Sequence, residues 1–427
     1  MVTRTREAMA VLRHRSVIAE AGPVEPGGNT TWCTINQLMQ SGRLIIHDFA
    51  QISEASIAFR DLTVLVGAQG TGKSLALQWL KAAIDGKYIV KTLREAGQEV
   101  SRKTLIDLIF GVGMGSAWRD TSKVSFDGKD VSPTTIEKRG DGVEKLFFIP
   151  AHRSMLISDG WATAFQRLTP ETPVVARLFS QNLFERFNAR EGAKLFPLDR
   201  LLKKVYRELV NDAVFHGGTI GVEQTEQLAR RLRLRFKGRE ETSLPFMTWT
   251  AGQREFTPLL LGLYHLLPPR MKKKDDNIDW VVVEEPEMGL HPQAVTVFML
   301  LVLDLLWRGY RVVLSTHSPI VITAIWALQR LAANHASYQL VCDAFSVPPR
   351  HRTSLRPVAE SALTKSYATY VLGYAGDNQV TATDISSLDP SDADDAVSGW
   401  GGLAGFSSRF AESVRDAVNN APRAEVS

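Results

Sequence analysis

The stretch that decides the fold is GAQGTGKS, residues Gly67–Ser74. It fits the pattern G-x-x-x-x-G-K-[ST] of a phosphate-binding loop. An apolar stretch, TVLVG, leads into it, and LALQWLKAAIDG follows with apolar residues at helical spacing and Gly86 as its expected end. A strand, a glycine-rich loop and a helix in this order are the context that the motif requires. The sequence therefore predicts an α/β nucleotide-binding fold.

Each residue type in this loop has a physical task. The glycines let the backbone curl so that N–H groups point at phosphate oxygens, and the helix N-terminus adds partial positive charge. Lys73 would reach the β- and γ-phosphates, and the Ser74 hydroxyl would bind Mg²⁺. We expect the loop to bind nucleotide through Gly67, Gly70, Thr71, Gly72, Lys73, Ser74 and Leu75.

A second stretch, DWVVVEEPEMGLHP (Asp279–Pro292), has an apolar run followed by two glutamates. Such a run is typical of a strand buried on both faces. Its carboxyl end would lie beside the phosphate loop, where open α/β sheets bind ligands. Glu284 would hold Mg²⁺, and Glu285 would polarise the attacking water as general base. Taken alone, the stretch could also be an acidic loop at a strand end.

Two further stretches flank this one. RVVLSTHSP (Arg311–Pro319) predicts another buried strand that places His317 near the γ-phosphate, with a structural histidine as the alternative. In WTAGQREF (Trp249–Phe256), Thr250 and Gln253 have the spacing of a capping box, so a helix is expected to start there. Gly252 would let a phosphate approach the N-terminus of that helix closely.

Composition excludes several classes of protein. The 427 residues suggest about three domain-sized units, or one large split domain. With 44% hydrophobic and 22% charged residues, the chain is neither wholly disordered, nor collagen, nor a small disulfide scaffold. Lys and Arg number 50 and Asp and Glu 46, so any basic functional surface must be local. Cys33 and Cys342 lie far apart and match no metal-ligand spacing, so no structural zinc site is expected. So few cysteines also favour a reducing compartment.

Neither a membrane span nor a secretory signal is expected. The longest apolar helix candidate, Ala294–Trp307, is short and carries Asp304. The stretch MVTRTREAMAVLRHRS carries charges throughout and has no apolar core. We therefore expect a cytoplasmic protein without membrane contact.

The order of the motifs resembles that of ATP-binding-cassette (ABC) ATPases. Within them the chain is similar to the RecF/SMC and OLD-type branch, through EEPEMGLHP, STHSP and FIPAHR (Phe148–Arg153). The resemblance covers roughly residues 42–330 and implies ATP and Mg²⁺ as cofactors, and hydrolysis of ATP to ADP and phosphate. It also implies a homodimer or higher homo-oligomer, in which each ATP lies between one phosphate loop and the partner's signature segment. Thr250, Gly252 and Gln253 would contact the γ-phosphate in trans.

The resemblance also implies further roles. Glu285, the switch histidine His317 and Lys73 would be catalytic, and Ser74 and Glu284 would bind the metal. There are two departures from the pattern: Glu284 replaces the usual aspartate, and no clear glutamine-loop residue is found. His152 is the expected substitute, with a packed histidine as the alternative.

The fold expected from these motifs is α/β: a P-loop NTPase with an ABC-type ATPase head, an antiparallel β lobe and a helical insert. We expect a flexible leader, an N-terminal half of the head with the phosphate loop and β lobe, a helical insert, a C-terminal half with the remaining motifs, and an extension of unassigned role. The corresponding ranges are 1–40, 41–153, 154–215, 216–330 and 331–427.

One basic stretch bears on what the ATPase acts on. In RRLRLRFKGR (Arg230–Arg239), five cations alternate with apolar or small residues, so a strand would carry them on one face. Nucleic-acid contact, partner contact and a solvated face balanced by Glu240 and Glu241 all remain open. The basic residues within 270–274 more simply form a solvated loop. The alternating cations are Arg231, Arg233, Arg235, Lys237 and Arg239.

OLD-type proteins often carry a Toprim nuclease domain, but Asp392-Ala393-Asp394 follows a turn-like stretch and does not predict one.

Two hypotheses for the function follow. The first hypothesis is a stand-alone ATPase that dimerises on ATP and couples hydrolysis to nucleic-acid sensing or processing. It would act in anti-phage defence or DNA repair with a separate effector, such as a nuclease. The second is a nucleotide-gated module that controls a partner protein without contacting DNA. A transporter subunit is disfavoured by EEPEMGLHP.

Overall fold

The computed structural model describes residues 42–138, 140–188, 194–198, 201–224, 229–268, 277–376 and 379–419. The expected leader, residues 1–40, and the basic loop at 270–274 lie outside these residues. The same holds for the side chains of Arg239, Glu240 and Glu241.

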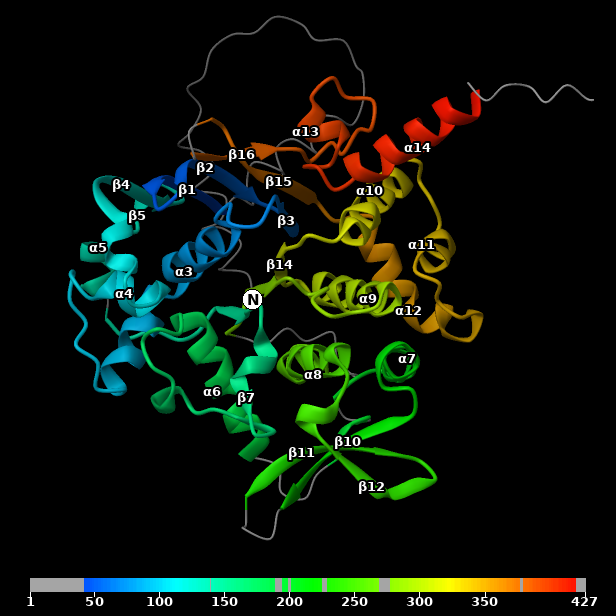
Figure 1. Ribbon diagram of the computed structural model, residues 1–427, viewed down its shortest axis with the longest axis horizontal. Coiled ribbons are helices and arrows are strands. Elements are labelled where there is room, and N and C mark those ends of the chain that lie inside the picture. The colour runs from blue at the N-terminus through cyan, green and yellow to red at the C-terminus, as the bar shows by residue number, and fades with distance from the viewer. Residues whose placement is uncertain are drawn as a thin grey trace, which may run out of the picture. The chain divides into compact units, whose positions relative to one another are not determined.

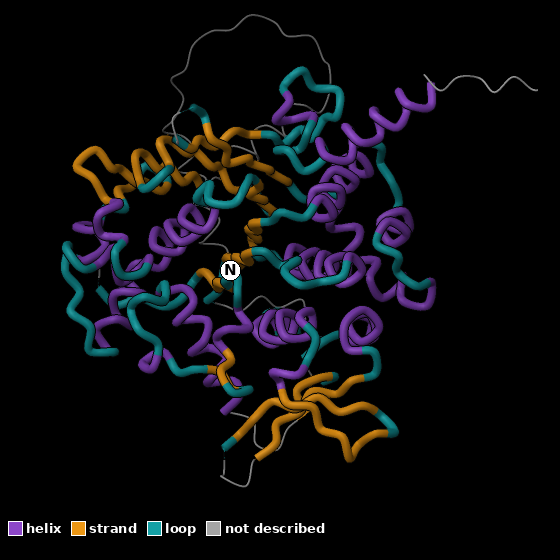
Figure 2. Tube along the Cα trace, in the orientation of Figure 1, coloured by secondary structure: helices purple, strands orange, loops and turns teal. Residues whose placement is uncertain are grey.

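A ten-stranded mixed sheet organises the chain, in the order β5-β4-β1-β2-β16-β15-β3-β14-β13-β6 (Figures 1 and 2). The strands β15, β3, β14, β13 and β6 run parallel to one another. The strand bounds are β1 Gly42–Phe49, β2 Ile52–Phe59, β3 Leu62–Val66, β4 Trp118–Phe126, β5 Lys129–Asp130, β6 Leu146–Ile149, β13 Trp280–Glu284, β14 Arg311–Ser315, β15 Tyr367–Tyr374 and β16 Val380–Asp384.

Burial in the two halves of the sheet follows the sequence patterns. All residues of β3 and β13 are buried, as their continuous apolar runs predict for strands covered on both faces. In β1, buried residues alternate with more exposed ones, and β1 pairs antiparallel with β2 and β4. The expected antiparallel β lobe is therefore one end of the central sheet. The parallel half brings the carboxyl ends of β3, β13 and β14 to one edge.

The helix after the phosphate loop, α3 (Lys73–Glu95), is longer than expected. It does not end at Gly86 but kinks at Asp85 and continues for nine residues beyond Gly86. The reason is a buried polar cluster: the Asp85 carboxylate accepts from Lys81 Nζ at 2.7 Å and from the N–H groups of Lys145 and Leu146. Glu144 also accepts from Lys81. These bonds stabilise the bend and tie α3 to the start of β6.

The stretch expected as a helical insert, 154–215, contains both helices and strands. Its longest helix is α6 (Val174–Asn188), and α7 (Lys204–Val210) continues as a π-turn, η5 (Asn211–Phe215). A short hairpin, β7 (Ile157–Ser158) and β8 (Trp161–Ala162), lies in the same stretch. It also supplies one strand of a separate antiparallel sheet in the order β12-β11-β10-β9 (Figure 1). The bounds of that sheet are β9 Lys194–Phe196, β10 Gly218–Gln224, β11 Arg230–Phe236 and β12 Arg239–Pro245.

The expected extension, 331–427, supplies two strands of the central sheet. β15 lies parallel to β3, and β16 joins β15 to β2. The head therefore includes residues well beyond 330. The other helices are α4 Leu105–Phe110, α5 Pro133–Glu137, α8 Ala251–Leu263, α9 Pro292–Arg308, α10 Pro319–Ala333, α11 Tyr338–Ala344, α12 Pro349–Ala362, α13 Asp395–Ser398 and α14 Gly405–Asn419. Short 3-10 turns are η2 Met114–Ala117, η3 Arg153–Leu156, η4 Phe165–Arg167 and η6 Phe246–Thr248.

Buried charges in the helices have partners. Asp304, within the apolar helix α9, is fully buried and accepts from Lys203 Nζ, Tyr206 O–H and Arg308 Nε. The charge thus fixes α7 against α9. None of the helices in the described part of the chain is long and apolar enough to cross a membrane. Asp394 caps α13, which agrees with the turn expected near Asp392.

Candidate active site

The phosphate loop joins β3 to α3, as the sequence predicts. Gly67, Gly70 and Gly72 all have positive φ, a conformation that glycine adopts without steric cost. A Cβ on Gly67 would lie 2.1 Å from the Leu372 carbonyl oxygen on β15. Glycine at 67 is therefore required by the close passage of β15, in addition to the curl of the loop.

Lys73 lies inside the curl of the loop. Its side chain is buried, and Nζ donates to the carbonyls of Gly67 at 2.9 Å and Ala68 at 2.8 Å. Burial lowers the pKa of Lys73, while the charges of Glu285, Glu287 and Glu284 act to raise it. The ammonium group is thus placed by backbone carbonyls at the opening of the loop.

A cavity of about 210 Å³ opens over the loop. Eight residues predicted for the site contribute to its wall, together with Gln51 and Gln69, which sequence reasoning did not select. The predicted ones are Gly70, Thr71, Gly72, Lys73, Ser74, Leu75, Glu285 and His317. The structure therefore brings the phosphate loop, the general-base candidate and the switch histidine to one place.

Glu284 ends β13 and is buried at the edge of this site. Its Oε2 accepts from the Ala151 N–H at 3.2 Å, whereas Oε1 has no partner of hydrogen-bonding geometry in the described part of the chain. Burial raises the pKa of Glu284, and the approach of the Ser74 hydroxyl opposes this rise. An unpartnered carboxylate oxygen close to a serine hydroxyl is the oxygen set that suits Mg²⁺.

Glu285 adopts a backbone conformation that is rare outside glycine, with φ 41°. Its N–H donates to the Ser315 carbonyl at 2.9 Å, which joins the turn after β13 to the end of β14. The side chain is 30% exposed, and its Oε1 lies 3.6 Å from His317 Nε2. The turn thus directs Glu285 toward the cavity and beside the histidine.

Glu287 connects two of the motifs, a role that the sequence analysis missed. Its Oε1 accepts from Thr316 Oγ1 at 2.8 Å and from the His317 N–H at 2.5 Å. These bonds fix the loop that carries His317 relative to the turn that carries Glu285. The third glutamate of EEPEMG was the available signal, because carboxylates on a tight turn often bind neighbouring backbone N–H groups.

Two residues from outside the motifs support the phosphate loop. Gln51, in the turn between β1 and β2, donates from Nε2 to the Gly70 carbonyl at 2.7 Å. Tyr374, at the end of β15, donates to the same carbonyl at 3.2 Å. Neither position carries a local motif, so no sequence signal pointed to them.

His152 does not pack into the core. It is exposed and has φ 48°, so the alternative of a packed histidine is wrong. It lies just after β6, and its carbonyl starts the turn η3 by accepting from the Met155 N–H. The glutamine-loop role of His152 stays a prediction. The neighbouring Arg153, in contrast, is fully buried and is considered below.

The signature candidates lie at the N-terminus of α8, where Thr250 and Gln253 form the expected capping box. The Gln253 side chain is occupied internally: Oε1 accepts from the Thr250 N–H, and Nε2 donates to the Val214 carbonyl. Thr250 is exposed. Neither these residues nor Gly252 line the cavity over the phosphate loop of the same chain. The Gln253 side chain therefore points inward, and the trans contact of Thr250, Gly252 and Gln253 with a partner's nucleotide stays a prediction.

A match to a family model assigns the family of the chain. Residues 62–323 match the family model described as "AAA domain, putative AbiEii toxin, Type IV TA system". The chain belongs to this family. The matched range contains every candidate residue of the site, from Gly67 to His317. The matched family is an AAA domain, and the phosphate loop Gly67–Ser74 lies within the matched range.

Among solved structures, three SMC heads resemble this AAA-domain chain. The SMC head domain from Thermotoga maritima is 13% identical and has a TM-score of 0.36; 81% of this chain and 99% of that one are covered. An SMC head bound to the C-winged helix domain of ScpA is 11% identical and has a TM-score of 0.41; 81% of this chain and 97% of that one are covered. An Smc head with an extended coiled coil, bound to the C-terminal domain of ScpA from Pyrococcus furiosus, is 10% identical and has a TM-score of 0.36; 88% of this chain and 99% of that one are covered. No curated protein sequence matches the chain.

Substitution of Gly252 tests directly whether the signature segment takes part in an ATP-dependent dimer. A Cβ at 252 would lie 2.9 Å from the Gly289 carbonyl oxygen. Gly252→Asp should add this clash and a negative charge at the helix end that would meet phosphate. We expect monomer ATP affinity within about threefold of wild type and loss of ATP-dependent dimers, measured by nucleotide binding and light scattering.

Gly128→Asn is the matched control for Gly252→Asp. Gly128 has positive φ, has open space around an added Cβ, and lies in the hairpin between β4 and β5. Asparagine tolerates this conformation, so dimer formation should be unchanged. An intact ATP-dependent dimer in Gly252→Asp would show that Gly252 has no part in a trans contact.

Proposed function

We propose that the chain hydrolyses ATP and that two heads close around two nucleotides when ATP is bound. The observation that carries this proposal is the meeting of Lys73, Glu285 and His317 at one cavity while the signature helix N-terminus lies outside it. A site with its own phosphate loop and general base, but without its signature segment, is complete only when a second copy supplies Thr250 and Gly252.

In the proposed reaction, the loop N–H groups and Lys73 bind the phosphates, and Ser74 and Glu284 hold Mg²⁺. The bound Mg²⁺ would neutralise charge on the β- and γ-phosphate oxygens. Glu285 accepts a proton from the attacking water, and His317 orients Glu285 and the γ-phosphate from the neighbouring loop. The positive end of the partner's α8 helix meets the charge that develops in the transition state.

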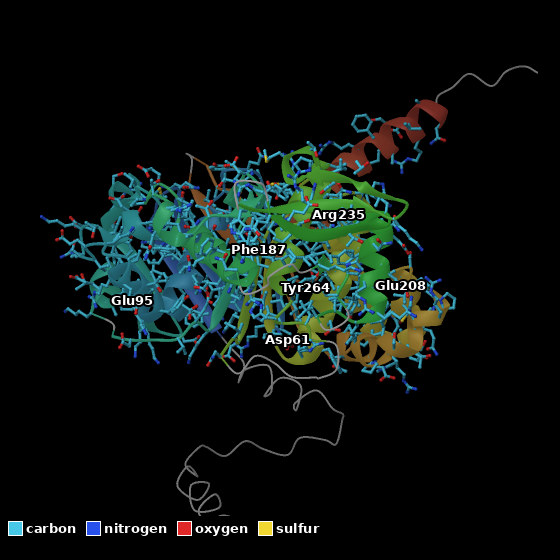
Figure 3. All side chains as sticks on the ribbon, turned by 90° about the horizontal axis from the view of Figure 1, so that it is seen from below. Asp61, Glu95, Phe187, Glu208, Arg235 and Tyr264 are labelled. Atoms are coloured by element: carbon cyan, nitrogen blue, oxygen red, sulfur yellow. The ribbon has the colours of Figure 1, made fainter. Side chains whose placement is uncertain are left out.

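We further propose that nucleic acid controls this turnover through β11. The predicted alternation is present: Leu232 and Leu234 are buried, whereas Arg231, Arg233 and Arg235 are more accessible. Figure 3 shows Arg235 on this part of the molecule. An arginine row on a strand face suits contacts with successive phosphates of a nucleic-acid backbone.

One observation favours the second hypothesis, a nucleotide-gated module without DNA contact. Glu223 on β10 forms ion pairs with both Arg233, at 3.1 Å, and Arg235. Ser243 on β12 donates to the same carboxylate at 2.9 Å. Two of the three arginines on this face of β11 are thus partly neutralised within the sheet, as expected for a solvated, internally balanced face.

The test is ATP turnover with and without double-stranded DNA, using Glu285→Gln as the blank. Under the first hypothesis, DNA should stimulate turnover several-fold. Changing Arg231, Arg233 and Arg235 together to alanine should abolish the stimulation and leave basal turnover unchanged. The number of phosphate contacts also sets how steeply DNA affinity falls with salt concentration. The triple variant should therefore show a shallower salt dependence of DNA affinity, by the amount expected for losing up to about three phosphate contacts.

Arg356→Ala is the control for the arginine variant, because Arg356 is an exposed arginine of α12 that pairs with Glu360. It should leave the response to DNA unchanged. Turnover that ignores DNA in the wild type would rule out the nucleic-acid hypothesis and favour the partner-gated module.

The setting that we propose is the cytoplasm, in anti-phage defence or DNA repair with a separate effector. The family description names a putative AbiEii toxin of a type IV toxin–antitoxin system. Within the described residues no cluster of metal-ligating side chains suggests a second, nuclease centre.

A further inference from the structure

Arg153 is one of the largest fully buried side chains of the molecule. It lies in η3, directly after β6 and beside the nucleotide site. Its guanidinium group donates only to backbone carbonyls: Nε bonds to Glu255 O at 3.0 Å, and Nη1 bonds to Pro150 O and Glu284 O at 3.4 and 3.1 Å. Three separate segments therefore meet at one cation.

The contacts with the turn after β13 concern the candidate base directly. Nη1 and Nη2 reach the Glu285 carbonyl at 3.4 and 3.5 Å, and Nη2 reaches the Pro286 carbonyl at 3.3 Å. This is the turn in which Glu285 has φ 41°. A conformation that L-residues rarely adopt persists only when its surroundings fix it. Arg153 provides that constraint on one side, and Glu287 provides it on the other.

The contacts with α8 concern the signature segment. Glu255 lies one turn after Thr250, and its carboxylate is 12% exposed and 3.9 Å from Arg153 Nε. Ser154, next to Arg153, donates to the same carboxylate. Because a helix moves as a rigid rod over one turn, a displacement of its N-terminus is felt at Glu255.

We propose that Arg153 is a positioning residue that couples the signature helix to the catalytic turn of the same head. This inference rests on the proposed function, in which the N-terminus of α8 meets the partner's nucleotide. Closure of α8 on that nucleotide moves Glu255, and Arg153 transmits the shift to the backbone of Glu285. Each head thereby places its own base only after its signature segment has engaged the other ATP.

The chemistry of arginine suits this role. A guanidinium is a planar group with five N–H donors in fixed directions, whereas the ammonium of lysine is a compact point charge on a flexible stem. Lysine would retain the positive charge near Glu255 but could not hold several carbonyls in one plane. Arg153→Lys therefore separates geometry from charge, and Glu255→Gln separates charge from shape.

The first experiment compares Arg153→Lys and Glu255→Gln with wild type for nucleotide affinity, kcat, KM and thermal stability. We expect ATP affinity and KM within about threefold of wild type. The value of kcat should fall by about 10–100-fold, the range expected when a catalytic group is displaced by about 1 Å. Asp159→Asn is the control, since Asp159 is exposed in the turn of the β7–β8 hairpin that follows η3, and asparagine retains its positive-φ conformation.

A merely structural role would lower the melting temperature and the active fraction without changing kcat per folded site. If Arg153→Lys does not fold, Glu255→Gln still tests the proposal, because it preserves the main-chain acceptor of Arg153 Nε. An unchanged kcat in folded Glu255→Gln would overturn the coupling.

The second experiment combines each variant with Thr250→Gly, which removes the exposed hydroxyl of the signature segment with little loss of helix capping. In wild type we expect Thr250→Gly to lower kcat by about tenfold, and in Arg153→Lys by less than about threefold, because coupled residues have non-additive effects. Additive losses would overturn the coupling while leaving the paired heads intact. No loss in either background would overturn the proposed function itself, and the coupling with it.

Discussion

Lys73→Ala is expected to weaken ATP binding severely. In the ligand-free loop, Lys73 Nζ donates to two carbonyls of the same loop, and burial already lowers its pKa. Exchange of these neutral acceptors for phosphate oxygens gives the ammonium stronger partners, since hydrogen bonds between charged groups contribute about 1.5–3 kcal/mol each. Loss of two such bonds corresponds to roughly a 10²–10⁴-fold weaker affinity, at 1.4 kcal/mol per tenfold change.

The measurement is the affinity for ATP and for inorganic tripolyphosphate, by calorimetry or fluorescence. Both should weaken together, because Lys73 is expected to contact the phosphates and not the adenine ring. Lys91→Ala on the same helix is the control: Lys91 is exposed and pairs with Glu95 at 3.9 Å. Near-normal ATP affinity in Lys73→Ala, with the control also normal, would refute the assignment of the loop.

Glu285→Gln should bind ATP, fail to hydrolyse it and accumulate as closed dimers. Glutamine has nearly the shape of glutamate, so the turn held by Arg153 and Glu287 is preserved. Its amide cannot accept the proton from water, and the loss of a general base lowers the rate about 10²–10⁴-fold. Removal of one negative charge 3.6 Å from His317 also lessens repulsion between the protein and the γ-phosphate.

Single-turnover hydrolysis and light scattering on one preparation check both parts of this prediction. Glu284→Gln is the informative comparison, because it should weaken the Mg²⁺-dependent affinity for ATP. Glu284 lies buried, and its Oε1 has no hydrogen-bond partner among the described residues. Glu360→Gln, at an exposed position of α12, should change neither property. Full turnover by Glu285→Gln would remove Glu285 as the base.

The sequence sufficed for the parts of the fold that are encoded locally. The apolar runs of β13 and β14 could be assigned to buried strands, because a strand covered on both faces favours such runs. The capping box of Thr250 and Gln253 marked the start of α8, because its two hydrogen bonds join residues three positions apart. Each of these signals lies within a few residues of the feature that it predicts.

The rest depends on contacts between residues far apart in the chain. Arg153 was only part of a resemblance in FIPAHR, since its partners Glu255 and Glu284 lie more than 100 residues later. Gln51 bonds to the phosphate loop through a turn that carries no motif. The bend of α3 at Asp85 depends on N–H groups of β6, 60 residues away. Such tertiary bonds override local preference and leave no periodic pattern.

The position of β15 determines when the central sheet can be completed during synthesis of the chain. β3, which leads into the phosphate loop, borders β15, and Asp61 just before β3 accepts from the Ser366 N–H across 305 residues of chain. At 5–20 residues per second, a ribosome needs roughly 15–60 s to make that intervening chain. During this time one edge of β3 has no strand to pair with, and unpaired strand edges favour association with other chains. This edge of β3 is therefore open to such association until β15, Tyr367–Tyr374, has been made.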